Sequence, residues 1–600
     1  MRLAVIYREL FLLLLTLATC RNAPTTKTNI HDKSYWYDKN YKLINDRMGY
    51  LQVNHLPRVK NVVIFIGDGM GTSTITASRV YKRQISQNPN ARLTFDDFPA
   101  TAIVQTDIEN SQIPESAASS TALFCGVKTN YEYLGIDVTS TGKKVCEEKN
   151  SHTPSIISWA QEKNLKTGFV TTTRVTHATP ASLYAHSRRH MEDDSKGDTH
   201  GCKDVARQLI ENKTGKNLNV IMGGGMMTLI KREEDGSGGR RKDGKNLTAE
   251  WLLHHPNGEF VTNRDEMMNI SHKTEHVLGI FARSHMEFNA DRNKKIEPSL
   301  AEMTLTAIEI LKRKNQRGFL LVVEGGKIDL AHHQNQAYRA LDDTLAFDEA
   351  IKVAMKNLDL SQTLIIVTSD HSSAMSYSGF ATPKNQSILG MDIYISNIDQ
   401  KPYQILTYSS GIGYQNYTEE IAMKDFKNAI HKSTVPTTWS NHGGEDVPLY
   451  AIGPMSTLLF SGTFDQTYMP HAIAYAMCIF KYESRCQRQS NEIHNEIERP
   501  QVEEKTSGIE ALRKELYKAK NENQTVKIEE QTEIENITIS TTESNYDENL
   551  NNDTFSDSLV FESSDLVSNL TTNDNENSSS NVFCNSFVVV ILVTLLSIKF

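Results

Sequence analysis

The sequence predicts an α/β fold, a three-layer α/β/α sandwich built around a central, mostly parallel sheet. Short apolar runs rich in β-branched residues recur along the chain and alternate with helical patterns, as in parallel sheets covered by helices on both faces. Five of these runs are predicted to be buried strands, over residues 61–66, 166–172, 218–222, 319–323 and 363–368. The 600 residues are enough for a large core, and the net charge of −9 predicts no nucleic-acid partner.

The two ends of the chain predict a secreted protein that stays on the extracellular face of the cell membrane. Arg2 precedes an apolar stretch, Leu10–Leu17, and small residues follow it, so residues 1–20 are predicted to be a signal peptide. An apolar tail at 587–598, behind small polar residues, indicates a GPI-anchor signal over 578–600. A tail-anchor helix is the alternative, but about 20 apolar residues are needed to span a bilayer.

Between these ends, composition divides the chain into a main body, residues 21–490, and a polar stalk, residues 491–577. The stalk is rich in Glu, Asn, Thr and Ser and poor in aromatics, which predicts a disordered, glycosylated spacer. Within the body, residues 21–57 are expected to form an arm that packs on the body or on a partner, 231–246 a surface excursion, and 379–440 an inserted region. Sequons for N-glycosylation fall in the body at Asn212, Asn246, Asn269, Asn385 and Asn416.

Seven cysteines are too few for a disulfide scaffold but fit a secreted protein with a few bridges. One lies at the predicted cleavage site and one in the discarded tail. Cys125, within an apolar helical stretch, is predicted to be free and buried. Two disulfides are predicted among the others, Cys478 with Cys486 and Cys146 with Cys202.

Carboxylates and histidines follow the carboxyl ends of three predicted strands, the edge where ligands bind in open α/β sheets. Each is explicable alone as a helix cap, a turn or a surface residue, but three such endings in one chain indicate a site. Asp329 and His333 stand four residues apart at the start of a helix expected to run on through Ile351, so both project from one face. The strand-end side chains are Asp68, Glu324, Asp329, His333, Asp370 and His371.

A serine and further ligands complete the pattern. Ser116 stands at a predicted helix start, where free N–H groups and the helix dipole favour an anion, although a plain N-cap serine is the commoner reading. Thr179 follows the strand at 166–172, and His442 lies in a polar loop. Mixed histidine and carboxylate sets suit zinc, and oxygen-only sets suit magnesium. A serine beside such metals can act as a nucleophile, which points to phosphoryl or sulfuryl transfer.

Taken together and in this order, these motifs resemble the alkaline phosphatases of the eukaryotic, membrane-anchored type, over roughly residues 35–486. The resemblance implies the α/β/α core with a small crown-like insertion, hydrolysis of phosphate monoesters, and a homodimer. The motifs that carry it are Gly67-Asp68-Gly69-Met70-Gly71, Ser116-Ala117-Ala118, the run Thr171 to Pro180, the run Val323 to Asp329 with His332-His333, Asp370-His371-Ser372, and His442-Gly443-Gly444-Glu445-Asp446.

The resemblance also implies a role for each residue, with two Zn²⁺ and one Mg²⁺ per chain. Ser116 becomes phosphoserine. One zinc is expected on Asp68, Asp370 and His371, and the other on Asp329, His333 and His442. Magnesium is expected on Asp68, Thr179 and Glu324, with His177 nearby.

The sequence departs from the family in two places near the nucleophile. Glu115 stands where the family has aspartate, and the segment after Tyr184-Ala185-His186 is one residue short. The phosphate-binding arginine of the family therefore falls on Arg189 or on His190. We favour Arg189, because a planar guanidinium reads phosphate bidentately. The longer Glu115 is expected to compensate for the shortened segment.

The extra calcium site of mammalian members is expected to be weak or lost. Ala282 stands where those members carry a carboxylate, while Glu297 and the pair Glu233-Glu234 remain as ligand candidates. Two rival functions are considered. A sulfatase or phosphodiesterase would usually lack the magnesium set. A catalytically weakened surface receptor on the same fold would have no reason to retain eight metal ligands.

Overall fold

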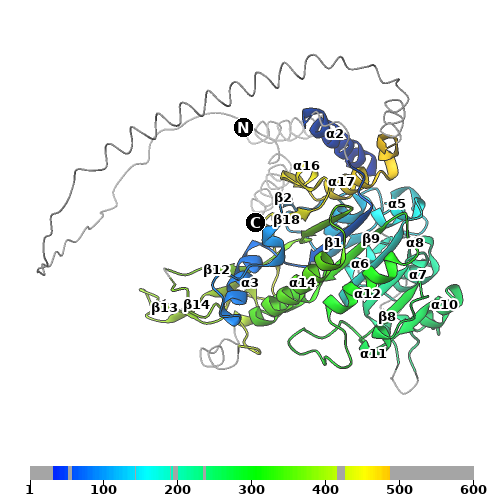
Figure 1. Cartoon of the computed structure of the whole chain (residues 1–600). Coiled ribbons are helices and arrows are strands. Elements are labelled where there is room, and N and C mark those ends of the chain that lie inside the picture. Colours follow the sequence, from blue (N-terminus) through cyan, green and yellow to red (C-terminus); the bar gives the residue numbers. More distant parts are fainter. Residues whose placement is uncertain are drawn as a thin grey trace, which may run out of the picture. The chain divides into compact units, whose positions relative to one another are not determined.

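The central sheet has ten strands, in the order β19-β2-β18-β10-β1-β9-β4-β6-β8-β7, and only β18 is antiparallel to the strands beside it. Its strands β1, β9 and β8 can be followed across the domain in Figure 1. All five predicted strands are confirmed, as β1, β4, β6, β9 and β10. The strands are β1 Asn61–Gly67, β2 Ala100–Gln105, β4 Lys166–Arg174, β6 Val220–Gly224, β7 Glu259–Val261, β8 Val277–Ile280, β9 Phe319–Gly325, β10 Thr363–Thr368, β18 Val447–Ile452 and β19 Gly462–Asp465.

This computed structural model describes residues 31–51, 57–141, 144–188, 191–193, 201–233, 238–380, 382–414 and 426–486. The predicted signal peptide, stalk and anchor signal lie outside these ranges, as do Arg189, His190, Glu234 and Asn416. Within the described ranges, no helix combines the length and the apolar character needed to cross a membrane.

Alternate side chains of β1 enter two separate cores, which makes the sheet the middle of three layers. Ile64 packs with helices α5 (Ile156–Glu162) and α17 (Tyr468–Met477). Phe65, one residue on, packs with α12 (Leu300–Lys312) and α14 (Ala337–Asn357) on the opposite face. Successive strand residues point to opposite faces, so an all-apolar strand is the mark of a sheet covered on both sides.

The helix expected after β9 is broken in two, which corrects the sequence-based prediction. Asp329 and His333 lie on a short helix, α13 (Lys327–His333), and α14 begins only at Ala337. Between them the buried Asn335 takes the left-handed conformation (φ 54°), which asparagine tolerates better than most residues. Its amide donates to the Ser410 carbonyl and accepts from the Gly413 N–H, so the break fastens the inserted region to the domain.

The inserted region, here called the crown, forms two small sheets outside the central one. It begins at β12 (Met375–Tyr377), slightly before the predicted residue 379, and includes β15 (Leu406–Gly411), β16 (Ser433–Pro436) and the pair β13 (Met391–Ile395) and β14 (Pro402–Gln404). Its two ends are joined at the base. There β11 (Ser372–Ser373) pairs with β17 (His442–Gly443), and this holds the residues next to His371 beside His442.

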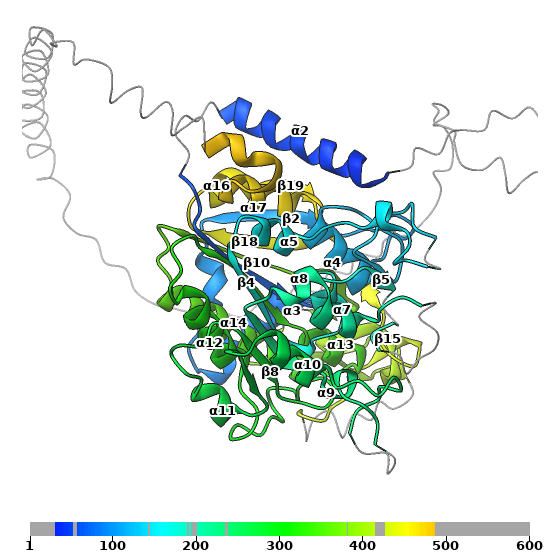
Figure 2. The same cartoon turned by 90° about the vertical axis from the view of Figure 1, so that its right-hand side faces the viewer.

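The N-terminal arm packs on the body of its own chain. It forms α2 (Lys33–Leu51), which lies along α17 (Figure 2). Trp36, Tyr37 and Ile44 are buried there, and the Tyr37 ring contacts His471 of α17 edge-on, with centroids 5.0 Å apart.

The structure contains both disulfides, Cys146–Cys202 and Cys478–Cys486, and Cys125 is free and buried. Where the structure describes it, the stretch 231–246 is largely exposed, as predicted for a surface excursion, but one arginine within it is buried. Arg241 is 1% exposed and donates both terminal nitrogens to Asp204, over 3.1 and 2.9 Å. The excursion is therefore anchored from inside, through a buried ion pair.

Replacing Arg241 with alanine is expected to lower the free energy of unfolding by about 3 kcal/mol, because it leaves the buried Asp204 carboxylate without its partner. Denaturant unfolding of the purified protein measures this. As a control, Arg92→Ala removes an ion pair with the exposed Asp97 and should cost less than about 1 kcal/mol. Equal losses in the two variants would contradict the anchoring role.

Candidate active site

The predicted ligands converge because their strands are neighbours. Strands β10, β1, β9 and β4 lie side by side in the sheet, and their register pairs Ile66 with both Glu324 and Thr368. The carboxyl ends are therefore level, and residues that are hundreds of positions apart in the sequence meet at one edge.

The first ligand group consists of Asp68, Asp370 and His371, all fully buried. His371 Nε2 lies 3.3 Å from Asp370 Oδ2 and 3.6 Å from Asp68 Oδ1. The His371 Nδ1 atom is 3.0 Å from the Ser372 carbonyl, which orients the ring with Nε2 toward the carboxylates.

The second group consists of Asp329, His333 and His442. His333 Nε2 lies 3.0 Å from Asp329 Oδ2 and 3.3 Å from His442 Nε2. Backbone carbonyls of Ser440 and Pro114 contact the other ring nitrogen of each histidine, at 2.6 and 2.9 Å. The His371 and His442 rings stack with centroids 3.8 Å apart, so the two groups are adjacent.

The third group consists of Asp68, His177 and Glu324. Asp68 thus belongs to two groups. Thr179, at the start of the short helix α6 (Ala178–Ala181), brings Oγ1 within 3.5 Å of Asp68 Oδ2. The Glu324 carboxylate is held by β4, because its Oε2 atom accepts from the hydroxyls of Thr171 and Thr173.

A single glycine permits this crowding. Gly69 has φ 66°, and a Cβ placed on it would lie 2.8 Å from Asp329 Oδ1. Its N–H donates to Asp370 Oδ1 over 3.2 Å. The turn after β1 can therefore set Asp68 against its neighbours only with glycine in this place.

The chemistry of these donors fits bound cations. Burial and the nearby carboxylates Asp370, Asp329 and Glu324 raise the pKa of Asp68 well above its ordinary value. Burial raises the pKa of Glu324 to about 7, and burial with Asp329 raises that of Asp370 to about 6. One oxygen of each of the four carboxylates is buried and has no hydrogen-bond partner among the described residues. Buried carboxylates of like charge need positive charge between them, which metal ions supply.

Ser116 stands at the beginning of α4 (Ser116–Cys125), 2% exposed, with Oγ 3.2 Å from His371 Nε2. Glu115 caps this helix. Its carboxylate accepts from the N–H groups of Ala117 and Ala118, over 2.7 and 2.9 Å, and from the Glu132 N–H over 2.9 Å. The cap fixes the first turn and therefore the position of the serine.

A pocket of about 660 Å³ opens onto the second and third groups, since Asp329, His333, His442 and His177 line it. Its rim carries exposed apolar side chains that can contact the organic part of a substrate. These are Ile113, Tyr131 and Trp439, which are 49%, 50% and 65% exposed.

The same pocket has a charged wall that the sequence does not mark. Arg174 donates from Nε and Nη2 to Glu192, both over 2.8 Å, and its Nη1 contacts His285. Arg174 is part of the run Thr171 to Pro180, but Glu192 and His285 follow none of the five strands predicted from the sequence and belong to no motif. Glu297, a candidate ligand of the calcium site that is expected to be weak or lost, belongs to none of the three ligand groups found among the described residues. Its Oε1 accepts from the Glu287 N–H.

Known proteins are similar to this chain in both sequence and fold. The alkaline phosphatase family model matches residues 59–479. Human tissue-nonspecific alkaline phosphatase is 37% identical over 491 residues, which are 78% of this chain and 93% of that protein. The membrane-bound alkaline phosphatase of Bombyx mori is 35% identical over 486 residues, 76% of this chain and 88% of that protein.

Among solved structures, that of Thermus thermophilus alkaline phosphatase has a TM-score of 0.53 and 22% identity, covering 72% of this chain and 96% of that one. At this identity the likeness shows the fold alone. The family match spans the central sheet and the three ligand groups together. The chain belongs to the alkaline phosphatase family, whose activity is the hydrolysis of phosphate monoesters.

Proposed function

We propose that the protein hydrolyses phosphate monoesters through a phosphoserine intermediate on Ser116, with two zinc ions and one magnesium ion. The observation that carries this proposal is the arrangement of three ligand groups that share Asp68 beside a buried serine at a helix start. Asp68, Asp370 and His371 would hold one zinc, and Asp329, His333 and His442 the other. Asp68, Thr179 and Glu324 would hold magnesium, with His177 close by.

When bound, the ions lower the pKa of hydroxyl groups and water and neutralise charge on the phosphoryl oxygens. The chain's own residues position the reaction. The Ser116 oxygen attacks phosphorus and the ester oxygen leaves as an alcohol. Water then attacks the phosphoserine, releasing inorganic phosphate and restoring the serine. Glu115 keeps Ser116 in place throughout, because it holds the first turn of α4.

Trapping the intermediate tests the proposal. The purified protein is incubated with an aryl phosphate, quenched in acid and digested, and the peptide that contains Ser116 is analysed by mass spectrometry. We expect a phosphate on Ser116 and turnover that depends on added zinc and magnesium. Steady turnover with phosphate on another residue, or with none, would contradict it.

Arg189 is our proposed phosphate-binding residue, with His190 the alternative, and Glu115 is proposed to compensate for the shortened segment around them. Glu115→Asp is therefore expected to lower kcat roughly tenfold, because the shorter side chain cannot keep all three N–H contacts. Steady-state kinetics with an aryl phosphate measures this. A clear rise in kcat would contradict the compensation, and an unchanged thermal midpoint would show that the variant is folded.

The proposed setting is the extracellular face of the cell membrane, with a GPI anchor and a homodimer. Two disulfides suit an oxidising compartment. Of the proposed glycosylation sites, Asn246, Asn269 and Asn385 are exposed and Asn212 is half-buried. A calcium site is not part of the proposal, because the ligand position at Ala282 has no side-chain oxygen.

A further inference from the structure

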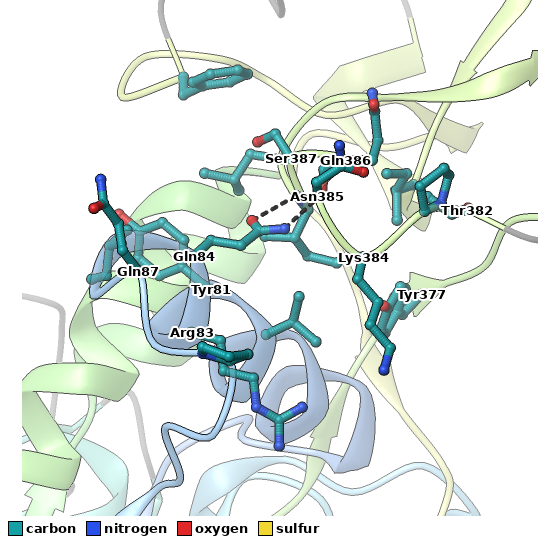
Figure 3. Close-up of a pocket in the computed structure, with 18 of the residues that line it drawn as sticks. Tyr81, Arg83, Gln84, Gln87, Tyr377, Thr382, Lys384, Asn385, Gln386 and Ser387 are labelled. Carbon is teal, nitrogen blue, oxygen red and sulfur yellow. Dashed lines mark hydrogen bonds between the residues drawn. The ribbon is translucent and has the colours of Figure 1, made fainter.

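A second large cavity, of about 930 Å³, lies between α3 (Thr72–Ile85), α14 and the crown (Figure 3). It shares no lining residue with the active-site pocket. We call it the crown groove. Its size is within the range of sites that hold small organic molecules.

Aromatic and aliphatic side chains line much of the crown groove, and several of them are only partly buried. Tyr81 and Tyr338 are half-buried, with ring centroids 6.2 Å apart, and Tyr377 is 40% exposed. Val80, Tyr81, Tyr338 and Phe426 are the partly exposed edge of a small core cluster that joins α3, α14 and the crown. A bound group that covered these side chains would bury more apolar surface and would stabilise the packing of the crown on α3 and α14.

One wall of the groove is a crown loop, residues 382–389, which is held firmly to α3. The Gln84 side chain donates to the Gln386 carbonyl over 2.6 Å and accepts from the Ile388 N–H over 3.1 Å (Figure 3). The Gln386 side chain donates to the Met391 carbonyl over 2.6 Å. The loop therefore presents its residues at a fixed place on the wall.

That wall carries a glycosylation sequon, Asn385-Gln386-Ser387, and all three residues line the groove. Asn385 is exposed, as a glycosylation acceptor must be. We propose that the crown groove binds an N-linked glycan attached to Asn385, and that the first sugars of this glycan pack on Tyr81, Tyr338 and Tyr377. The proposal rests on the glycosylation proposed above and not on the phosphatase chemistry.

The chemistry of the groove suits a carbohydrate. Sugar rings have apolar C–H faces that pack on aromatic rings, and their hydroxyls take hydrogen bonds from polar side chains. Tyrosine supplies both an apolar face and a hydroxyl. Besides Asn385 itself, the charged and amide side chains that line the groove can contact sugar hydroxyls. These side chains are Arg83, Gln84, Gln87, Asn90, Lys384 and Gln386.

Contacts between sugars and tyrosines are individually weak, but a covalent link to Asn385 compensates for their low affinity. A glycan joined to Asn385 meets the tyrosines at an effective concentration that is in the millimolar range for short flexible tethers, so no strong intrinsic affinity is required. Asn246 and Asn269 are also exposed sequon residues, but neither lines the crown groove. Asn269 serves as the matched control, because the Asn246 side chain also caps the helix α10 (Leu247–His254) by accepting from the Ala249 N–H.

The test compares thermal inactivation of the full-length protein, made in a glycosylating host, with that of variants. Glycopeptide mass spectrometry first establishes that Asn385 is occupied. Asn385→Gln and Ser387→Ala, which remove the same glycan in different ways, are each expected to speed inactivation about fivefold. Asn269→Gln is expected to leave the rate within about twofold. Trimming to the first sugar with an endoglycosidase should retain most of the protection.

A double-mutant comparison shows whether the glycan protects the protein by packing on the groove or only by raising its solubility. Tyr377→Ala should speed inactivation in the glycosylated protein and add little in the Asn385→Gln background, because one contact is lost in either case. Three results would overturn the proposal: an unoccupied Asn385, inactivation of both sequon variants at the parent rate, or a Tyr377 effect of equal size with and without the glycan. None of these results bears on Ser116 or its phosphatase role.

Discussion

Replacing Ser116 with alanine is expected to lower kcat for an aryl phosphate by at least about 10³-fold, while the protein folds and binds metal normally. The substitution removes the oxygen proposed to attack phosphorus, and residues that act together in nucleophilic catalysis lose most of their effect when one is missing. The lost group is small and the helix keeps its cap, since Glu115 rather than Ser116 binds the first N–H groups of α4. Steady-state kinetics with saturating zinc and magnesium measures the effect.

The same helix offers a matched control. Ser119 lies three residues further on, is fully buried, and its hydroxyl has no hydrogen-bond partner within the part of the chain that the structure describes. Ser119→Ala should leave kcat within about twofold. If Ser116→Ala lowered kcat no more than Ser119→Ala, Ser116 would not be the nucleophile.

Replacing Asp68 with alanine is expected to remove more metal than any other single ligand change, because Asp68 belongs to two ligand groups. We expect magnesium and at least one zinc to be lost per chain, with a fall in kcat on the order of 10³-fold. Metal content by mass spectrometry and kinetics on the same preparation give the answer. Chelation of the unmodified protein should also lower its Tm, because the buried carboxylates would then repel one another without a cation.

Substituting a buried aspartate outside the site is a control that distinguishes loss of metal from general destabilisation. Asp348 is 2% exposed and pairs with Lys82 over 2.6 Å. Asp348→Asn should lower the thermal midpoint and leave metal content unchanged. Full metal occupancy in Asp68→Ala would contradict the shared-ligand assignment.

The sheet and the clustering of the ligands could be predicted because both depend on short-range patterns. A run such as 363–368 is apolar on both faces, and the residues that follow it reach the ligand-binding edge whatever the loops do. The break between α13 and α14 could not be predicted in this way. It depends on Asn335 bonding to Ser410 and Gly413, which are more than 70 positions away.

Other features escaped prediction for the same reason. The charges and glycines around Arg241 look like a solvated loop, and the guanidinium is buried because the distant Asp204 and Thr228 accept its hydrogen bonds together with the nearby Asp243. Tyr131 and His285 reach the pocket from segments that carry no local motif. Arg189 and His190 lie outside the described residues, so the choice between them remains a proposal based on the resemblance.

The paired base of the crown has an evolutionary consequence. Since Ser373 and His442 are partners in one ladder, the chain leaves and re-enters the domain at nearly the same point. The outer part of the crown, such as β13 and β14, makes none of the contacts through which Ser410, Gly413 and Ser440 hold Asn335 and His333. It can therefore be lengthened, shortened or exchanged between relatives without changing the separation of His371 and His442. The outer surface of such an enzyme can therefore diversify rapidly, for new neighbours or new habitats, while the chemistry beneath it is inherited unchanged.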